Sequence, residues 1–343
     1  MRVLIAGLGA IGQRHARNLR VLRPDVDLLA YRRRRLRHVV TDALARDDGR
    51  DVESELGIRA FTDLGEALAA RPDAVFICNP TSEHMEVAQR AADHGAHLFV
   101  EKPVSHTTDG LERLRRTVEL RGLVALVGCQ WRFHPCVIAL RTLLQSGVLG
   151  SVRKAEIEYA EYLPDWHPYE DYRESYAARA ALGGGVVLTQ IHDYDLAWWL
   201  FGAPRTVHAS GGHMSDLEID VEDTVRATLR TSATTVLVSQ TFASRDVRRR
   251  IVVTAENATA TVDLVAGRLD VRPPVAPGLT LAGFQRNELF MAELLHFFWC
   301  IEGSATPLIP LDEGIDVLRV ALAVRASLAS GQTVELGRGD HNE

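Results

Sequence analysis

The 343-residue sequence predicts an α/β protein whose two domains meet near residue 128. Before that point, short apolar β-branched runs alternate with helical stretches, the pattern of βαβ units around a parallel sheet. After it, strand-like runs follow one another with short turns, which favours an antiparallel or mixed sheet. The length suits roughly two domains of about 150 residues each. We therefore expect domains at 1–128 and 129–343.

The elements of the N-terminal domain are predicted from its apolar runs. Five of them qualify as buried parallel strands: 3–7, 26–31, 73–79, 97–101 and 123–128. The segments between the later runs have helical spacing and a glycine near the end, so we expect helices there. The segment 36–57 is polar and rich in charge, and its helix signal is weak.

The C-terminal domain mixes helices with consecutive strands. Helical spacing marks four segments, near 134–147, 183–202, 284–302 and 313–330. Strand-like runs occupy 152–162, 206–210, 221–231, 234–242, 247–254 and 258–265. The segment LPDWHPYEDYRESYAAR (163–179) is predicted to be an aromatic, polar loop.

Composition and charge exclude several classes of partner. A net charge of −6 argues against a surface that binds nucleic acid or anionic membrane. No apolar run approaches the roughly 20 residues of a membrane span, and the glycine-interrupted N-terminus lacks a convincing cleavage site. The 4 cysteines form no CxxC pair, and no His/Cys cluster has metal-ligand spacing. We expect an unprocessed cytoplasmic protein that binds no metal, nucleic acid or membrane.

The turn GLGAIG (7–12) fits the pattern GxGxxG directly after a predicted strand and at the start of a predicted helix. In that context the glycines allow a tight turn, close approach of a pyrophosphate, and packing of helix against strand. We expect a dinucleotide here, contacted by the turn residues Gly7, Gly9, Ala10, Ile11 and Gly12.

The run YRRRR (31–35) ends the second predicted strand, where dinucleotide folds usually carry an acid, about 20 residues after the glycines, for the ribose 2′-OH. Arginines there instead suit a 2′-phosphate, which they bind through charge-assisted bonds. We therefore expect Arg32 and Arg33 to contact the cofactor, with NADP(H) favoured and NAD(H) possible. The two later arginines are expected to be solvated in a loop.

The segment NPTSEHMEVAQRAADHGAHLFVEKP (79–103) resembles the signature of the Gfo/Idh/MocA oxidoreductases, the glucose–fructose oxidoreductase and inositol dehydrogenase family. His15 completes the family pattern GxGxxGxxH. CQWRFHP (129–135) and GGGVVLTQIHDYD (183–195) also resemble family motifs, so the likeness spans nearly the whole chain. It implies cofactor contacts from Asn79, Pro80, Thr81, His84, Glu101 and Lys102.

This resemblance implies a Rossmann domain followed by an α/β domain with a large open, mostly antiparallel sheet. The outer face of that sheet is expected to form a homo-dimer or homo-tetramer. The resemblance also implies an active site between the domains. Family members act on sugars, inositols, nucleotide sugars, diols and even tetrapyrroles.

Oxidation of a secondary alcohol needs a general base and a donor that holds the oxygen. Lys102 ends a predicted strand at the ligand-binding edge, although a lone lysine is ordinarily a solvated surface residue. His192 exchanges protons near neutral pH, the alternative being a buried structural histidine. The resemblance favours His192 as acid/base with Lys102 bonded to the same oxygen. Asp195 is expected to orient the imidazole or to cap a neighbour.

The sequence departs from the family just before His192. Many members carry an aspartate four residues earlier, where this chain has Leu188 followed by Thr189 and Gln190. Either Thr189 or Gln190 contacts substrate instead, or Asp193 compensates from another angle.

Aromatic and basic side chains suit the faces and hydroxyls of a sugar, so the loop 163–179 is the predicted substrate loop. The alternative is a loop that packs on the sheet or on a neighbouring subunit. The expected substrate contacts are Arg132, Trp166, His167, Tyr172, Tyr176, Thr189 and Gln190, and His134 is a further candidate.

The function expected from these features is an NAD(P)-dependent oxidoreductase acting on a secondary alcohol or ketone of a sugar, inositol or nucleotide-sugar-like substrate. The alternatives are a non-catalytic dinucleotide-binding sensor or partner subunit, redox-assisted hydrolysis or elimination, and imine reduction.

Overall fold

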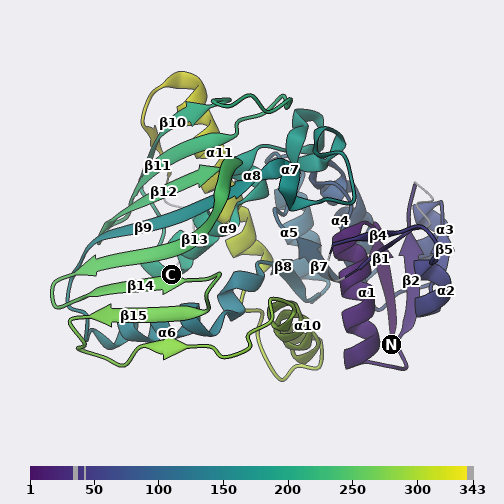
Figure 1. Ribbon diagram of the computed structural model, residues 1–343. Coiled ribbons are helices and arrows are strands. Elements are labelled where there is room, and N and C mark those ends of the chain that lie inside the picture. The colour runs from purple at the N-terminus through teal and green to yellow at the C-terminus, as the bar shows by residue number, and fades with distance from the viewer. Residues whose placement is uncertain (34–37, 42–43, 338–343) are drawn as a thin grey trace.

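The structure is a computed structural model that describes residues 1–33, 38–41 and 44–337. It has two lobes, each built on its own sheet (Figure 1). The first sheet has 6 parallel strands in the order β5-β2-β1-β6-β7-β8. They are β1 (Arg2–Ala6), β2 (Asp27–Tyr31), β5 (Arg59–Phe61), β6 (Ala74–Ile77), β7 (His97–Glu101) and β8 (Ala125–Gly128). The parallel sheet confirms the predicted Rossmann domain.

Helices connect these strands: α1 (Ala10–Leu22), α2 (Val52–Leu56), α3 (Leu64–Ala69), α4 (His84–Asp93) and α5 (Leu111–Leu120). The polar segment 36–57 contains only the short helix α2 within its described part, preceded by the hairpin β3 (Val39–Val40) and β4 (Arg46–Asp47). Asp51 caps α2 by accepting a bond from the backbone N–H of Glu53. A segment without an apolar stripe cannot bury a long helix against the sheet.

The second sheet has 9 strands in the order β16-β15-β14-β13-β9-β12-β11-β10-β17, and only the β9–β12 pair is parallel. The predicted strands are β9 (Val152–Tyr162), β10 (Thr206–Gly212), β11 (Thr224–Arg230), β12 (Thr235–Thr241), β13 (Ala243–Ala255) and β14 (Thr259–Asp263). Three short strands were not expected: β15 (Arg268–Arg272), β16 (Leu279–Thr280) and β17 (Val334–Glu335). The mostly antiparallel sheet agrees with the predicted fold class.

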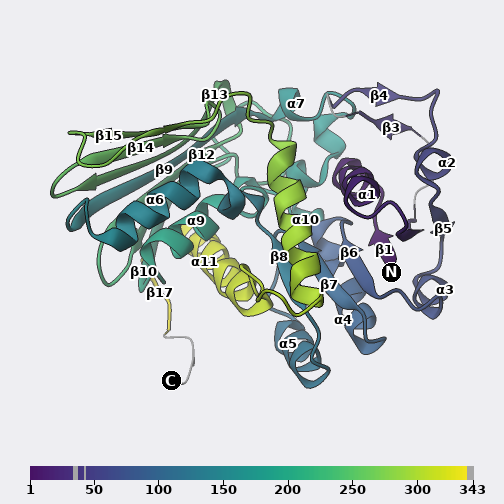
Figure 2. The ribbon, with the colours of Figure 1, turned by 90° about the horizontal axis from the view of Figure 1, so that it is seen from below.

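One face of this sheet is covered by helices α6 (Pro135–Ser146), α9 (His192–Phe201) and α11 (Leu311–Ser330) (Figure 2). Buried residues alternate with half-buried ones along β12, as expected for a sheet packed on one side only. No helix of the described residues is long and apolar enough to cross a membrane.

Helix α10 (Asn287–Ile301) follows the second sheet in sequence but packs against the first domain. Its Phe297 meets the rings of Phe76 and Phe99 on strands β6 and β7, with centroids 5.6 Å apart in each case. The first sheet ends at Gly128, as expected, but its core is completed by a helix from the far end of the chain.

A buried ion-pair cluster lies just after that sheet. Arg132, in the short 3₁₀ turn η2 (Gln130–Phe133), donates from Nε and Nη2 to the Asp195 carboxylate and from Nη1 to Glu313. Its side chain is 0% exposed. The polar groups of Arg132, which was expected to contact substrate, are thus bonded within the protein, and Asp195, expected to orient the His192 imidazole or to cap a neighbour, accepts from Arg132.

We expect Arg132→Met to lower the free energy of unfolding by about 3–5 kcal/mol, because Asp195 is left buried without its counter-charge. Urea unfolding midpoints measure the change. The double variant Arg132→Met/Asp195→Leu serves as the control and should recover most of the loss. A single variant within about 0.5 kcal/mol of the parent protein would contradict the role assigned to the cluster.

Candidate active site

The glycine turn forms a cradle at the end of β1. Gly7 has a φ of +99°, and a Cβ there would lie 2.7 Å from the backbone N of Asn79. A Cβ on Gly12 would lie 2.0 Å from the Gly7 carbonyl oxygen, whereas a Cβ on Gly9 would meet nothing within 4 Å. Gly9 caps the N-terminus of α1, whose first turn, with Ala10 and Ile11, carries no acidic residue. This open space before free helix N–H groups fits the pyrophosphate of a dinucleotide.

The two described arginines after β2 differ in their surroundings. The Arg32 side chain is 7% exposed, and its Nη2 lies 2.7 Å from the Glu53 carboxylate. The Arg33 side chain is 57% exposed; it donates to the Tyr31 hydroxyl and to the Glu83 carboxylate. Arginines 34 and 35, expected to be solvated, lie outside the described residues. No carboxylate ends β2, in agreement with the sequence.

His84 and Glu101 each connect two segments of the first domain. The two ring nitrogens of His84 lie 2.9 Å from the backbone oxygens of Asn79 and Pro103. Glu101 accepts from His15 Nε2 at 2.6 Å beneath the glycine turn. Both side chains are buried and bonded within the first domain, where they tie its neighbouring segments together.

The loop after β6 approaches the end of the substrate loop. Asn79 donates to Glu83 across the turn that contains Pro80 and Thr81. A Cβ on Gly183 would lie 3.1 Å from Thr81 Cβ, so the two domains meet closely here.

Lys102 ends up at the boundary between the domains. It directly follows β7, and its Nζ donates to the backbone oxygen of Thr189 at 2.8 Å. Burial lowers the pKa of Lys102 to about 8. At neutral pH the ammonium predominates, yet it loses its proton far more readily than an exposed lysine.

His192 begins α9 on the other side of the boundary and is buried. Burial holds its pKa well below the ordinary value, and the positive charges of Lys102, Arg249 and Arg286 lower it further. His192 Nδ1 has no hydrogen-bond partner among the described residues. The ring is thus neutral at pH 7 and able to accept a proton.

Of the residues that replace the family aspartate, Gln190 is hydrogen-bonded within the protein through its side chain, whereas the buried Thr189 hydroxyl has no partner among the described residues. Thr189, the last residue of the short helix α8 (Val186–Thr189), is 0% exposed, and Gln190, which follows it, is 2% exposed. Gln190 Oε1 accepts from Arg249, and its backbone oxygen accepts from Gln240. Asp193 also accepts from Gln240, and burial raises its pKa to about 6. The contacts of Asp193 are thus with Gln240 and Arg249 and not with the imidazole.

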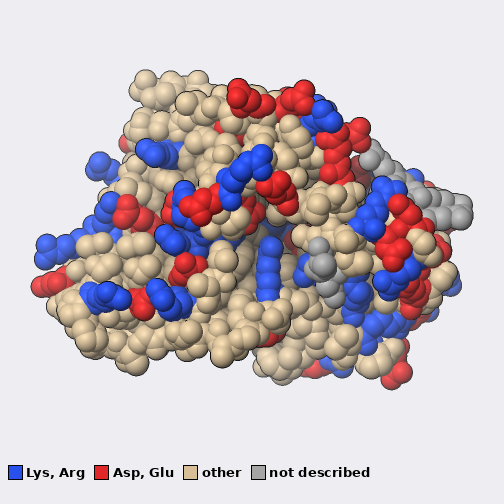
Figure 3. Space-filling view, viewed as in Figure 1, with Lys and Arg blue, Asp and Glu red and all other residues tan. Residues whose placement is uncertain are grey.

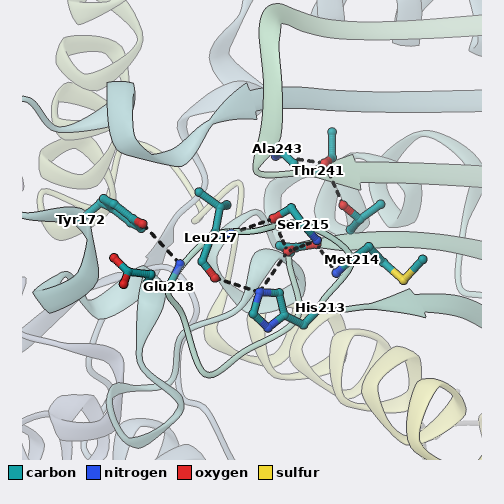
Figure 4. Close-up of polar contacts among 10 residues, drawn as sticks. Tyr172, His213, Met214, Ser215, Leu217, Glu218, Thr241 and Ala243 are labelled. Atoms are coloured by element: carbon teal, nitrogen blue, oxygen red, sulfur yellow. Dashed lines mark hydrogen bonds and ion pairs between the residues drawn. The ribbon is translucent and has the colours of Figure 1, made fainter.

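The substrate loop divides into two parts. Trp166, at the end of α7 (Leu163–Trp166), stacks on His167 with ring centroids 4.1 Å apart. Burial raises the pKa of Tyr176, as does the nearby charge of Glu101. The Tyr172 hydroxyl accepts from the backbone N–H of Glu218 (Figure 4).

His134, a further candidate for the pocket, caps the N-terminus of α6. It is 0% exposed, and its Nδ1 accepts from the backbone N–H of Cys136 as the N-cap of α6. Burial lowers the pKa of His134 to about 4, which keeps the ring neutral and able to accept that bond.

Two arginines near the site were not predicted. Arg249 on β13 and Arg286 just before α10 both lie against the indole of Trp131, at 4.8 and 5.6 Å from the ring centroid. Lys and Arg side chains are visible inside the hollow between the two lobes (Figure 3). No local pattern identifies these residues, because strand and loop arginines are common and only the fold brings them together.

The arrangement combines a cofactor cradle, a lysine and a neutral histidine at one domain boundary. It suits proton removal from an alcohol beside a bound dinucleotide.

Comparison with known proteins agrees with this geometry. The family model described as oxidoreductase family, NAD-binding Rossmann fold, matches residues 1–129, and that of the GFO/IDH/MocA C-terminal domain matches residues 137–261. The chain is 26% identical to the scyllo-inositol 2-dehydrogenase (NAD(+)) of Bacillus subtilis (strain 168), over 98% of this chain and 96% of that protein. It is 30% identical to the UDP-N-acetylglucosamine 3-dehydrogenase of Acidithiobacillus ferrooxidans, over 81% and 85% of the two chains.

Among solved structures, the WlbA dehydrogenase from Bordetella pertussis, in complex with NADH and UDP-GlcNAcA, superposes with a TM-score of 0.81 at 21% identity. The match covers 99% of both chains and shows that they share a fold. Because the two family models together cover most of its length, the chain belongs to the Gfo/Idh/MocA family of oxidoreductases, with an NAD-binding Rossmann domain.

Proposed function

We propose that this protein is an NAD(P)-dependent dehydrogenase that oxidises a secondary alcohol of a sugar, inositol or nucleotide-sugar-like substrate, or reduces the corresponding ketone. The observation that carries the proposal is the Lys102–Thr189 bond, because it holds a lysine of low pKa between the cofactor cradle and His192. The names of the similar dehydrogenases support this class of substrate.

We assign the catalytic roles of His192 and Lys102 from the charge that each side chain carries at pH 7. His192, neutral at pH 7, accepts the hydroxyl proton, while the Lys102 ammonium donates to the same oxygen and stabilises its developing negative charge. The nicotinamide, when bound, accepts the hydride. Trp166, His167 and Tyr176 would bind the ring of the substrate, whereas Thr189 and Gln190 hold Lys102 and Arg249 in position.

Lys102→Ala should reduce kcat by orders of magnitude while the dissociation constant for the cofactor changes little, because the cradle is untouched. Steady-state kinetics and quenching of NADPH fluorescence measure the two quantities. A near-normal kcat would remove Lys102 from the mechanism. Bound cofactor that turns over without any net change in absorbance would indicate redox-assisted elimination instead.

The pH profile tests which group is the base. In the oxidation direction kcat/KM should fall below the depressed pKa of His192, where the ring gains a proton. It should fall again above about pH 8, where Lys102 loses its proton. Lys102→Arg should abolish the alkaline limb, because guanidinium does not titrate in this range. A rate that instead rises through pH 8 would make Lys102 the base.

We further propose a preference for NADP(H) over NAD(H), based on Arg32 and Arg33 and on the lack of a carboxylate at the end of β2. Arg32→Ala/Arg33→Ala should weaken NADPH binding about 10- to 100-fold and NADH binding little, because one or two charged hydrogen bonds are lost. Glu53→Gln is the matched control. It releases Arg32 from its carboxylate partner and should strengthen NADPH binding selectively. Equal effects on the two cofactors would contradict the preference.

We also propose that the protein is cytoplasmic and forms a homo-dimer or homo-tetramer through the face of the nine-stranded sheet opposite α6, α9 and α11. On that face Leu237 is half-buried between Glu156 and Thr228 of the neighbouring strands. Leu237→Arg should shift the mass measured by light scattering toward the monomer, whereas Leu237→Ala should leave it unchanged. A parent protein that is already monomeric at micromolar concentration would exclude this interface.

A further inference from the structure

Two guanidinium groups flank one indole ring beside the proposed acid/base pair. Arg249 lies over Trp131 and also over Tyr159, at 4.8 and 4.5 Å from the ring centroids. Arg286 lies over Trp131 and Phe290, at 5.6 and 6.0 Å. Burial, together with the positive charge of Arg249, lowers the pKa of Arg286 to about 10. The two cations therefore repel each other, and an anion bound by both would offset that repulsion.

Arg249 is a buried cation whose donors are only partly used. Its side chain is 6% exposed, and Nη2 donates to Gln190 Oε1 at 2.9 Å. Its Nη1 has no hydrogen-bond partner among the described residues. The Asp193 carboxylate lies 4.0 Å from Nη1, beyond hydrogen-bond distance. An unused donor on a buried charge is costly, and a ligand oxygen would satisfy it.

Arg286 is exposed, and its guanidinium lies beside the rings of Trp131 and Phe290. Within the described part of the chain its side chain makes no hydrogen bond or ion pair with a carboxylate. It also stands at the N-cap of α10, where the helix dipole disfavours a positive charge. The nearby Glu161 is engaged by the Tyr159 hydroxyl at 2.9 Å. The fold therefore keeps this cation at an unfavourable position without a full partner.

Both arginines are connected to the reacting groups. Arg249 binds the side chain of Gln190, and Lys102 binds the backbone oxygen of Thr189, the adjacent residue. The charges of both arginines act on His192, two residues further along. An anion bound by the arginines would thus lie close to the hydroxyl that Lys102 and His192 contact.

We propose that Arg249 and Arg286 form an oxyanion subsite and that the substrate is an anionic sugar, with a carboxylate or phosphate attached to the ring that is oxidised. Arginine suits such a group because its planar fork donates two parallel bonds to carboxylate or phosphate oxygens. The inference rests on the proposed function and narrows its substrate class.

Binding is measured first, independently of turnover. Isothermal titration of the protein saturated with NADP⁺ uses three sets of ligands with matched rings: neutral hexoses, the corresponding hexuronates, and the corresponding hexose phosphates. At least one anionic member should bind about 10-fold or more tightly than its neutral counterpart, the effect expected of charged hydrogen bonds. The uronate and phosphate arms identify which oxyanion is preferred. No preference for any anionic member would overturn the proposal.

Variants then locate the subsite. Arg286→Met, at an exposed position, should raise KM for the anionic sugar about 10-fold or more relative to KM for its neutral counterpart, and so abolish most of the anionic preference. Arg249→Lys keeps the positive charge but lacks the planar guanidinium. This variant should lose part of the preference for the anionic sugar. Arg250→Met is the matched control, because Arg250 is exposed on the same strand and pairs with Asp263 instead. Equal losses for neutral and anionic sugars, or weakened binding of NADPH instead, would overturn the subsite.

The dehydrogenase assignment and the oxyanion subsite can be refuted independently of each other. Tight binding of an anionic sugar that Arg286→Met weakens, without oxidation of any sugar, would refute the dehydrogenase assignment and keep the subsite. Oxidation of neutral sugars without any preference for anionic ones would keep the dehydrogenase assignment and refute the oxyanion subsite.

Discussion

The bond from Lys102 Nζ to the Thr189 carbonyl is the contact on which the proposed site depends. It joins the carboxyl end of a parallel strand in one domain to the end of the short helix α8 in the other, just before α9. A buried ammonium needs acceptors, and a backbone carbonyl supplies one without adding a second titrating group. The lysine therefore stays charged at neutral pH, although its pKa is lowered to about 8.

The helix that carries His192 is fixed to the second sheet by a chain of buried amide and hydroxyl groups. Gln240 donates to the Gln190 backbone oxygen and to Asp193, and it accepts from the Tyr194 hydroxyl. A strand residue thus sets the position of α9 at both its start and its first turn. Such networks are effective when every member is satisfied, and here they surround a histidine that has no carboxylate to orient it.

Local patterns in the sequence were sufficient for the parallel sheet, the glycine cradle and the position of Lys102, because each depends on residues close together in the chain. Long-range partners were not accessible in this way. Arg132 and Asp195 are 63 positions apart, and each resembled a site residue until the fold paired them. His134 likewise differs from a pocket histidine only through the helix that it caps. Arg249 and Arg286 escaped notice because only the packing of β13 and α10 around Trp131 brings them to the site.

The same cations have two consequences for the chemistry. By lowering the pKa of His192, Arg249 and Arg286 favour the neutral ring that a proton acceptor requires. An anionic substrate would partly cancel their charge when it binds, which would raise that pKa toward the working pH. A base is most effective when its pKa lies near that pH. The substrate would therefore complete the base that acts on it, and a neutral sugar would leave His192 a weaker proton acceptor.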